Sequence, residues 1–239
     1  MSEVALVTGA GGALGSEVAR VLAARGDRVA LFDAAGAKGR LEQLAASLPK
    51  ACVVAGDLAD DATWREALPR VEKELGAAPS TAALIAGGWR GGRPLHELSI
   101  EAEEETWRAM LGSNLETVHK SLVRLLPPMV QAKRGSIVVI GSRVAVEPAT
   151  GAGSAAYATS KAAVVALAQA VAAEVLAHGV RVNSVLPSTM DTPANRAAMP
   201  KANPADWVSL GSAAGVVAFL LSDAARDISG AAVPLYGRA

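Results

Sequence analysis

Short apolar segments alternate with helix-forming segments along the whole chain, and this alternation constrains the fold more than any other feature. Several of the apolar segments show no period-two pattern, as expected for strands buried on both faces. Such repeats predict an α/β fold, a doubly wound parallel sheet (Rossmann fold) with helices on both faces. We predict about seven strands, at 4–8, 28–33, 51–55, 82–86, 136–140, 180–186 and 232–235.

The intervening segments predict helices near 13–25, 38–48, 61–75, 101–126, 154–178 and 211–222. No linker, charge block or repeat divides the chain, so we expect one domain over residues 1–239. Two long loops, 87–98 and 187–207, break the alternation. Long loops in compact domains are often lids or binding loops, and we expect these two to face a substrate.

The first predicted strand ends in the turn Thr8-Gly9-Ala10-Gly11-Gly12-Ala13-Leu14-Gly15, and a helix follows it. Glycines let backbone N–H groups approach a pyrophosphate, and a helix N-terminus favours its negative charge. A tight turn without a ligand is the alternative. The place of the turn, between a strand and a helix at the start of the chain, favours dinucleotide binding.

Asp33 ends the second strand, where a carboxylate can accept hydrogen bonds from the adenosine ribose and would repel a 2′-phosphate. Gly12 occupies a turn position where a basic residue could have served NADP(H). These residues favour NAD(H), while Lys38 and Arg40 are near enough to leave NADP(H) open. Asp57-Leu58 follows the third strand, at a position that commonly faces adenine in this fold, although an Asp there can equally cap a helix.

Tyr157 and Lys161 are four residues apart at the head of a long apolar helical segment, so they share one helix face. A nearby cation favours the phenolate and lowers the pKa of a tyrosine from its usual value of about 10. We therefore expect Lys161 to lower the pKa of Tyr157 and to make it a general acid/base. An exposed Tyr beside a Lys is the alternative.

Together these features resemble the short-chain dehydrogenase/reductase family over essentially the whole chain. Thr8, Gly9 and Gly15 match the family's glycine motif, while Ala13 replaces its middle glycine. The family's catalytic tetrad of Asn, Ser, Tyr and Lys is matched in order by Asn114, Ser142, Tyr157 and Lys161. The interval from Ser142 to Tyr157 is longer than the family usually has, which we attribute to an insertion within 147–153.

The resemblance implies a role for each tetrad residue. Tyr157 would exchange a proton with the substrate oxygen, and Ser142 would hydrogen-bond that oxygen. Lys161 would lower the pKa of Tyr157 and bind the nicotinamide ribose, and Asn114 would hold a water that links Lys161 to solvent. The resemblance also implies cofactor contacts at the glycine turn, at Asp33, Asp57 and Leu58, at Ala86, Gly87 and Gly88, at Tyr157 and Lys161, and at Pro187, Thr189 and Thr192.

A narrower resemblance concerns the dihydropteridine reductase branch, which uses NADH to reduce quinonoid dihydropterins. Segments 86–92 and 191–200 look like that branch, as does Ala13 in the glycine turn. Members of the branch lack the catalytic Ser and Asn, whereas this chain keeps Ser142 and Asn114. A full tetrad suits a carbonyl or alcohol substrate better, so the loops either set a pterin substrate or only record descent.

The leading hypothesis is an NAD(P)-dependent oxidoreductase acting on a small carbonyl or alcohol. Alternatives are a pterin reductase, a 3-oxoacyl-carrier-protein reductase and a non-catalytic NAD(H) sensor. A carrier-protein reductase normally favours NADPH and a basic docking patch, which Asp33 and the zero net charge disfavour. Sensors of this kind usually lack the Tyr/Lys pair. Trp89 is expected either to stack on a flat ring or to cap the core, while Met190, Met199 and Trp207 belong to the second long loop.

Composition limits the other classes of partner. Lys plus Arg and Asp plus Glu both number 23, so nothing supports a nucleic-acid or anionic-membrane partner. The apolar helical run 162–177 is too short and too polar for a membrane span, and the N-terminus lacks a signal-peptide pattern. A single cysteine, Cys52, suits a reducing cytoplasm, and the His and Cys spacing predicts no metal site. The resemblance implies a homodimer or homotetramer through helices 101–126 and 154–178.

Overall fold

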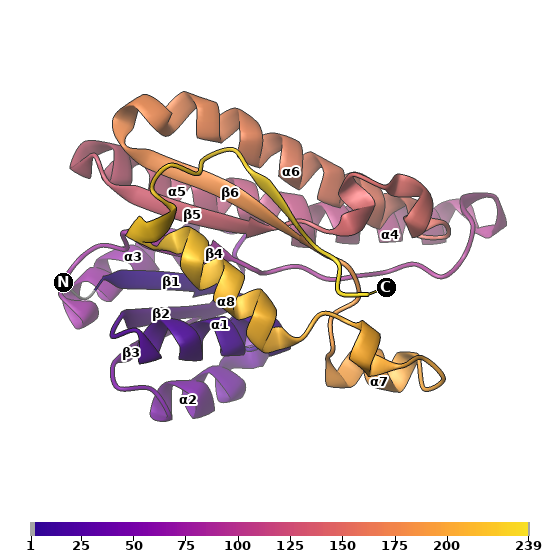
Figure 1. The fold of residues 1–239 in the computed structure, drawn as a ribbon, viewed down its shortest axis with the longest axis horizontal. Coiled ribbons are helices and arrows are strands. Elements are labelled where there is room, and N and C mark those ends of the chain that lie inside the picture. Colours follow the sequence, from indigo (N-terminus) through magenta and orange to yellow (C-terminus); the bar gives the residue numbers. More distant parts are fainter. Residues whose placement is uncertain (1–2, 239) are drawn as a thin grey trace.

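The computed structural model describes residues 3–238 and places seven strands in one sheet, in the order β3-β2-β1-β4-β5-β6-β7. Every neighbouring pair of strands is parallel. The predicted doubly wound parallel fold is therefore confirmed (Figure 1). The strands are β1 Val4–Thr8, β2 Arg28–Asp33, β3 Ala51–Ala55, β4 Thr81–Leu84, β5 Gly135–Ile140, β6 Val180–Pro187 and β7 Ala232–Leu235.

The central strands β1, β4, β5 and β6 are buried at every position, which explains why their sequences do not alternate. The prediction was wrong at the end of β4, which stops at Leu84 and not at residue 86. The backbone N–H groups of Ile85 and Ala86 leave the ladder because both donate to the side-chain hydroxyl of Thr8, at 2.9 and 3.1 Å. The chain therefore turns away from the sheet one residue after β4.

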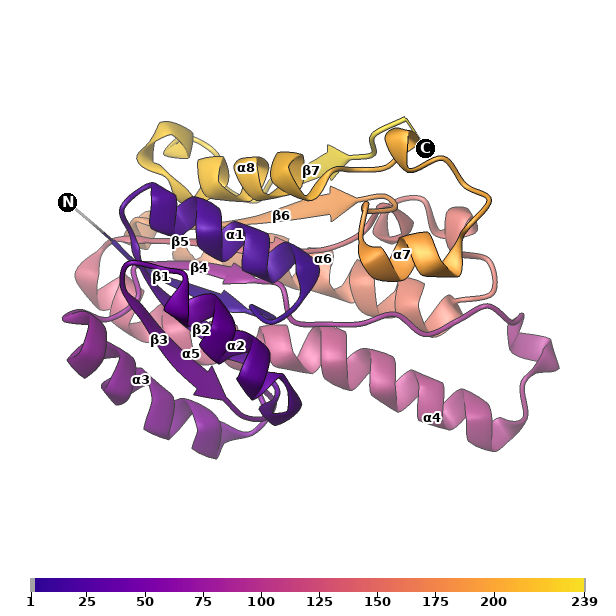
Figure 2. The same ribbon diagram turned by 90° about the horizontal axis from the view of Figure 1, so that it is seen from below.

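Two layers of helices cover the sheet (Figures 1 and 2). One layer contains α1 (Ala13–Ala24), α2 (Lys38–Ala46) and α8 (Leu210–Leu221), whose apolar residues form a core with one face of the strands. The other contains α3 (Asp61–Leu75), α5 (Thr117–Ala132) and α6 (Ala155–Val175). Helices α4 (Ile100–Met110) and α7 (Pro193–Ala198) extend beyond the carboxyl edge of the sheet (Figure 2).

The segment predicted as one helix at 101–126 is three elements. Helix α4 passes into a π-helical turn, Leu111–Glu116, before α5 begins. π-Helical turns inside longer helices frequently mark functional positions. Helix α5 also continues through Pro127 and Pro128, because Leu125 and Met129 on either side of them remain buried in the core.

Helix α7 was missed, because its segment was predicted as loop. The Thr192 hydroxyl accepts a hydrogen bond from the Asn195 N–H at 3.1 Å, and Pro193 is at the first helical position. These are ordinary signals of a helix N-terminus and were visible in the sequence.

The segment Ala155–His178, formed by α6 and the following 3₁₀ turn, is long and apolar enough to cross a membrane by length and composition, unlike the shorter apolar run 162–177 expected from the sequence. In this fold α6 packs against β5 and β6.

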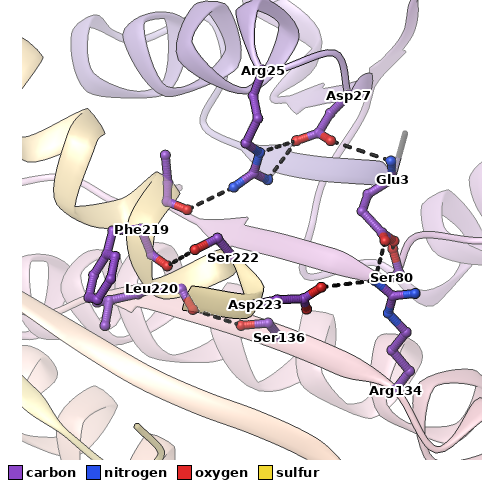
Figure 3. Close-up of polar contacts among 11 residues, drawn as sticks. Glu3, Arg25, Asp27, Ser80, Arg134, Ser136, Phe219, Leu220, Ser222 and Asp223 are labelled. Carbon is purple, nitrogen blue, oxygen red and sulfur yellow. Dashed lines mark hydrogen bonds and ion pairs between the residues drawn. The ribbon is translucent and has the colours of Figure 1, made fainter. Parts of the chain in front are cut away.

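Charged residues gather at the amino edge of the sheet, where the strands begin (Figure 3). Arg25 pairs with Asp27 at 2.6 Å, and Arg134 pairs with Glu3 and with Asp223. Arg181 is nearly buried, and its guanidinium donates to three carbonyl oxygens at the end of α8 and just beyond it, those of Leu220, Ser222 and Ile228. A cation near the end of a helix is favourable, and here it adds a further hydrogen bond to carbonyl groups that already have one donor each.

Candidate active site

The glycine turn between β1 and α1 needs glycine at its first and last positions. Gly9 has φ +66°, and a Cβ on it would lie 2.8 Å from the Ala86 nitrogen. A Cβ on Gly15 would overlap the Gly9 carbonyl oxygen. Helix α1 then begins at Ala13 with Gly12 as its N-cap, without a side-chain cap and without an acidic residue in its first turn. The first amides of α1 therefore suit an anionic group such as a pyrophosphate.

Asp33 reaches back to this turn from the end of β2. Its two carboxylate oxygens accept hydrogen bonds from the N–H groups of Gly11 and Ala34, at 2.9 and 2.7 Å. On the other side, Arg40 Nε donates to the Gly11 carbonyl at 3.0 Å. Gly11 is thus held at both its N–H and its C=O. An acceptor for ribose hydroxyls and a cation that could meet a 2′-phosphate lie at the same turn.

Three predicted cofactor residues have internal hydrogen bonds. The Thr8 hydroxyl, buried beneath the turn, holds the residues after β4 and so shapes the turn from below. Asp57 accepts a hydrogen bond from the Ala59 N–H at 2.9 Å, as in a turn cap. Leu58 is buried, and its carbonyl accepts the indole N–H of Trp64 at 2.9 Å. Asp57 remains exposed beside the carboxyl edge of β3.

Asn114 lies in the π-helical turn, is fully buried, and holds the loop after β4 by two hydrogen bonds. Its Oδ1 accepts from the Gly88 N–H at 2.9 Å, and its Nδ2 donates to the Gly88 carbonyl at 3.1 Å. A Cβ on Gly87 would overlap Asn114 Oδ1, so glycine is needed there. The carboxamide also contacts the Met110 sulfur at 3.8 Å and has one further partner, in α6. That Asn114 holds a water stays a prediction.

That partner is Ser160, a residue that sequence reasoning missed. Asn114 Nδ2 donates to the Ser160 hydroxyl at 3.0 Å, and that hydroxyl donates to the Tyr157 carbonyl at 2.8 Å. Ser160 is fully buried beside Lys161 in the sequence. Its place in the Tyr-x-x-Ser-Lys segment was visible, but its partner is 46 residues away and could not be inferred.

Lys161 is nearly buried, with 6% of its surface exposed. Its ammonium donates to the carbonyl oxygen of Ile140, the last residue of β5, at 2.8 Å. Burial lowers the pKa of Lys161 to about 8, from a usual value of 10.5. A carbonyl uses one of the three donors of the ammonium, so the other two remain for a ligand at this edge.

Tyr157 lies half-buried one turn before Lys161. Burial raises its pKa above the usual value, and a hydrogen bond with the Ser142 side chain acts in the opposite direction. Lys161 is not among the causes, so the expectation that this lysine lowers the pKa of Tyr157 was wrong for the protein as described. The phenol is held in its protonated form, which suits a proton donor.

Ser142 follows β5 and is buried. It occupies the N-cap position of the 3₁₀ turn Arg143–Ala145, but its side chain makes no capping hydrogen bond. Ser142 is the side chain whose hydrogen bonding lowers the pKa of Tyr157, so the two residues are neighbours. The long interval between the two residues is taken up by this turn and by a second one, Pro148–Gly151. The structure thus brings Asn114, Ser142, Tyr157 and Lys161 together at the carboxyl edge.

The loops above this edge hold the remaining predicted residues. Pro187 is buried at the end of β6, the Thr189 carbonyl accepts from the Val208 N–H at 2.9 Å, and the Thr192 hydroxyl caps α7. Trp89 is 60% exposed and does not cap the core. A hollow of about 160 Å³ lies between loop 87–98, α4 and the start of α6. The larger hollow, about 770 Å³, is at the amino edge, and no residue of the tetrad lines it.

Within residues 3–238 no group of three or more His, Cys, Asp or Glu side chains is placed to hold a metal ion. Cys52, the single cysteine, is buried under α3, and burial together with Glu74 raises its pKa to about 12.

Comparison with known proteins identifies the family. Residues 3–203 match the model described as short chain dehydrogenase. The 2,5-dichloro-2,5-cyclohexadiene-1,4-diol dehydrogenase of Sphingobium indicum is 30% identical, over 98% of this chain and 95% of its own. A short chain dehydrogenase/reductase family oxidoreductase from Burkholderia thailandensis has 30% identity and a TM-score of 0.84, covering 99% of this chain and 92% of that one. The chain belongs to the short chain dehydrogenase family.

A third comparison concerns a 3-oxoacyl-[acyl-carrier protein] reductase with bound NAD from Brucella melitensis. Its structure has a TM-score of 0.81 and 25% identity, and the match covers 98% of this chain and 90% of that one. These relatives are dehydrogenases and reductases of one oxidoreductase family. None of the three is named as a dihydropteridine reductase, so that narrower resemblance stays a hypothesis.

Proposed function

We propose that this chain is a nicotinamide-dependent oxidoreductase that interconverts a small carbonyl compound and its alcohol, with all 239 residues acting as one catalytic domain. One observation carries the proposal: Asn114, Ser142, Tyr157 and Lys161 converge at the carboxyl edge of the sheet, next to the glycine turn. In open α/β sheets ligands bind outside the carboxyl ends of the strands. A cofactor at the turn and a substrate at Tyr157 would therefore be neighbours.

When bound, the nicotinamide ring supplies or accepts the hydride at its C4. Tyr157, protonated at neutral pH, gives its phenol proton to the substrate oxygen in reduction and takes it back in oxidation. Ser142, the neighbour that lowers the pKa of Tyr157, would hydrogen-bond the substrate oxygen as negative charge develops there. Lys161 offers its remaining donors to the nicotinamide ribose. Asn114 fixes the loop at Gly88 that bounds the site.

We propose NAD(H) as the preferred cofactor. The Asp33 carboxylate at the ribose position favours hydroxyls over a phosphate, and the Brucella melitensis relative was solved with NAD. Arg40 is the group that would oppose this preference. Separate titrations of NADH and NADPH test it. Tighter binding of NADH is expected, and tighter binding of NADPH would refute the preference.

The Tyr157→Phe variant tests the catalytic role. Its kcat should fall by about 10²–10⁴-fold, which is the rate enhancement that a positioned acid/base group usually contributes. The Kd for NADH should stay nearly unchanged. The assay follows the loss of reduced nicotinamide with a panel of ketones, aldehydes and quinones. Turnover by Tyr157→Phe at the wild-type rate would remove Tyr157 from the acid role.

A pterin-like imine is the second candidate substrate, and the exposure of Trp89 favours it. The indole is 60% exposed on a glycine-flanked loop next to the site, so it is available to stack on a flat ring. Quinonoid dihydropterin therefore belongs in the same panel. Turnover far above that of every carbonyl would favour the pterin, and an inert pterin would mean that the loops only record descent.

Two further arms of the panel separate the remaining candidates. Selective turnover of 3-oxoacyl thioesters on a carrier protein would indicate the carrier-protein reductase. NADH binding without turnover of any substrate would indicate the sensor. The paired residues Tyr157 and Lys161 argue for chemistry, since a sensor has no use for them.

We also propose a cytoplasmic homodimer or homotetramer without a nucleic-acid or membrane partner. The net charge is zero, and exposed apolar residues lie along α4 and α5, namely Ile100, Trp107 and Val123. Helix α6 adds an apolar surface that the fold covers on one side. Light scattering should give two or four times the chain mass of 24.2 kDa, and a monomer mass would refute the assembly.

A further inference from the structure

The long loop 187–207 begins beside the candidate active site. The Gly141 N–H, one residue before Ser142, donates to the Val185 carbonyl at 2.9 Å. A Cβ on Gly141 would lie 2.5 Å from a Leu186 methyl group, so the chain just before Ser142 packs tightly on the end of β6. Any group that fixes the direction of the loop therefore also determines where its residues lie relative to the site.

Residues at and after the end of β7 attach to both stems of this loop. At the first stem, the Ser188 N–H donates to the Leu235 carbonyl at 3.0 Å, and the Ser188 hydroxyl donates to the Tyr236 carbonyl at 2.6 Å. At the second stem, the Arg238 N–H donates to the Asp206 carbonyl at 2.8 Å. The chain after β7 is therefore hydrogen-bonded to the loop where the loop begins and again where it ends.

Gly237, in the middle of the segment 236–238, must be glycine for two reasons. Its φ of +63° lies in the left-handed region, which costs a residue with a Cβ free energy. A Cβ there would also lie 2.6 Å from the Asp206 carbonyl oxygen and 3.1 Å from the Trp207 carbonyl carbon. Trp207 is buried, so the second stem cannot move away without exposing its indole.

The two stems are also joined to each other. The Asp191 N–H donates to the Val208 carbonyl at 2.8 Å, and the Val208 N–H donates to the Thr189 carbonyl at 2.9 Å. The base of the loop is thus closed, and the segment 236–238 fixes this closed base against β7. Thr189 and Thr192, two of the residues expected to contact the cofactor, lie at this base, so their place depends on the attachment.

The side chain of Tyr236 attaches the same segment at a third place. The Arg143 guanidinium lies over its ring, with the central carbon 5.0 Å from the ring centroid. A cation over an aromatic ring is attracted to it. The segment 236–238 is therefore fixed to the turn after β5 as well as to the loop, and it can serve as a support for the loop.

We propose that the segment 236–238 is a positioning element of the active site: it holds loop 187–207 in the orientation that binds the cofactor, and Gly237 is the residue on which this depends. The proposal rests on the proposed function, because it assigns the loop to cofactor binding. An apparent Kd rises as the fraction of molecules in the binding-competent conformation falls. The segment therefore governs affinity for the cofactor, and not the proton transfer at Tyr157.

The main test compares two glycines that have positive φ. Gly237→Ala places a Cβ against the Asp206 carbonyl and should detach the segment from the second stem. Gly26→Ala is the matched control, because Gly26 has φ +98° but a Cβ there would meet nothing within 4 Å. Gly26 lies at the amino edge, away from the loop. Denaturant titration of both variants confirms that each is folded and measures the stability that each loses.

A second pair of variants keeps the test available if Gly237→Ala does not fold. Ser188→Ala removes the side-chain hydrogen bond to the Tyr236 carbonyl and leaves the backbone bond at the same stem. Ser222→Ala is its control, because the Ser222 hydroxyl donates to the Phe219 carbonyl at 2.7 Å at the amino edge (Figure 3). Ser188→Ala should act in the same direction as Gly237→Ala and more weakly, while Ser222→Ala should behave as the wild type does.

The first readout is limited trypsin digestion, which needs no substrate. Lys201 is exposed between the two stems, and mass spectrometry identifies cleavage after it. Cleavage of a locally opened segment follows the population of the open form. Gly237→Ala should be cleaved after Lys201 about tenfold faster than Gly26→Ala, given the cost of a left-handed alanine. Equal rates in these two variants would overturn the proposal.

The second readout is the effect of NADH on the same digestion. A ligand that binds only the closed loop stabilises it, so saturating NADH should slow cleavage after Lys201 in the wild type. A wild type that binds NADH, as its fluorescence reports, without any slowing would overturn the assignment of the loop to the cofactor. A wild type that does not bind NADH would instead refute the proposed function, and the comparison of Gly237→Ala with Gly26→Ala would still test the attachment.

Kinetics provide the third readout, which a purely structural role would not move in this way. If the loop is ordered in about one molecule in ten, the Kd and the KM for NADH rise about tenfold. Saturating NADH restores the order, so Gly237→Ala should keep kcat near the wild-type value. Gly26→Ala should match the wild type in both constants. A lower kcat in Gly237→Ala with an unchanged KM for NADH would overturn the proposal.

Discussion

Two edges of one sheet bury a cation in different ways. At the carboxyl edge Lys161 is 6% exposed, and at the amino edge Arg181 is 9% exposed. Burial lowers the pKa of both. Lys161 donates to one carbonyl oxygen, whereas Arg181 donates to three. The Arg181 guanidinium at the amino edge uses its donors within the fold, whereas the Lys161 ammonium at the carboxyl edge has donors left for a ligand.

The neighbouring groups follow the same division. Near Arg181, Arg25 pairs with Asp27 and Arg134 pairs with Glu3 and Asp223, so the charges around the large hollow are matched within the chain (Figure 3). A hollow lined by such pairs offers few unused donors. The difference teaches that volume alone does not locate this active site. A buried polar side chain with donors that the chain itself does not use, such as the Lys161 ammonium, locates the active site better than the volume of a cavity does.

A large effect on kcat is expected at the loop that Asn114 holds through Gly88. Gly87→Ala would press a methyl group onto Asn114 Oδ1, so the carboxamide must move and the grip on Gly88 must loosen. We expect kcat to fall by about 10²-fold, because a displacement of this size in the loop that bounds the site can lower a rate by that factor. The neighbouring Gly88→Ala is the control, because its Cβ would meet nothing within 4 Å. Equal losses in both variants would contradict the assigned role of Asn114.

A smaller effect is expected from pH. Lys161 loses its proton near pH 8 in the free protein, and a bound anion or ribose favours the ammonium. The Kd for NADH should therefore begin to rise above about pH 8, by about fivefold, or ~1 kcal/mol, for the loss of a charged donor. Isothermal titration between pH 7 and pH 10 checks this. Lys161→Met should bind NADH more weakly with a nearly flat profile, and a wild-type slope in that variant would assign the titration to another group.

The smallest effect should come from an exposed ion pair at the amino edge. Arg134 is half-exposed and pairs with Glu3. Exposed pairs contribute about 0–1 kcal/mol, so Arg134→Gln should lower the free energy of unfolding by no more than that and leave kcat unchanged. Denaturant titration and the standard assay measure both quantities. A loss above about 2 kcal/mol would show that the amino-edge pairs are coupled more strongly than their exposure indicates.

Much of the fold followed from local sequence signals. Apolar segments without alternation located the central strands, and the glycines at 9 and 15 marked a turn that tolerates no side chain there. The π-helical turn at Asn114 could not be predicted, because the sequence on both sides favours an ordinary helix. Helix α7 could have been predicted, since Thr192 and Pro193 form a recognisable N-terminus.

The sequence suggested candidate members of the site but not the contacts that these residues make. Tyr157 and Lys161 are close in the chain, so their shared helix face was visible. The bonds of Asn114 to Gly88 and Ser160 join segments 26 and 46 residues apart. The stacking of Arg143 on Tyr236 spans a still longer interval and depends on how β7 ends. The pKa of Tyr157 was predicted in the wrong direction because it depends on burial, which spacing along a helix does not reveal.

The central claim is that one buried cation serves chemistry and the other serves the fold, and replacing each by methionine tests it directly. Lys161→Met removes a cation whose burial costs about 3 kcal/mol, given its pKa of about 8 against 10.5. Arg181→Met removes three hydrogen bonds from a charged donor, although each of the three carbonyls keeps a second donor. This loss should cost about 1–3 kcal/mol.

The measurement is the free energy of unfolding of both variants and the wild type at pH 7 and at pH 10, together with kcat. The wild type should gain stability from about pH 8 toward 10.5, because there the unfolded Lys161 still binds a proton that the folded one has released. Lys161→Met should be at least as stable as the wild type at pH 7, should lack this gain, and should be nearly inactive. Arg181→Met should be less stable but retain kcat. A destabilised Lys161→Met that keeps its activity, or a stable Arg181→Met that loses it, would contradict the account.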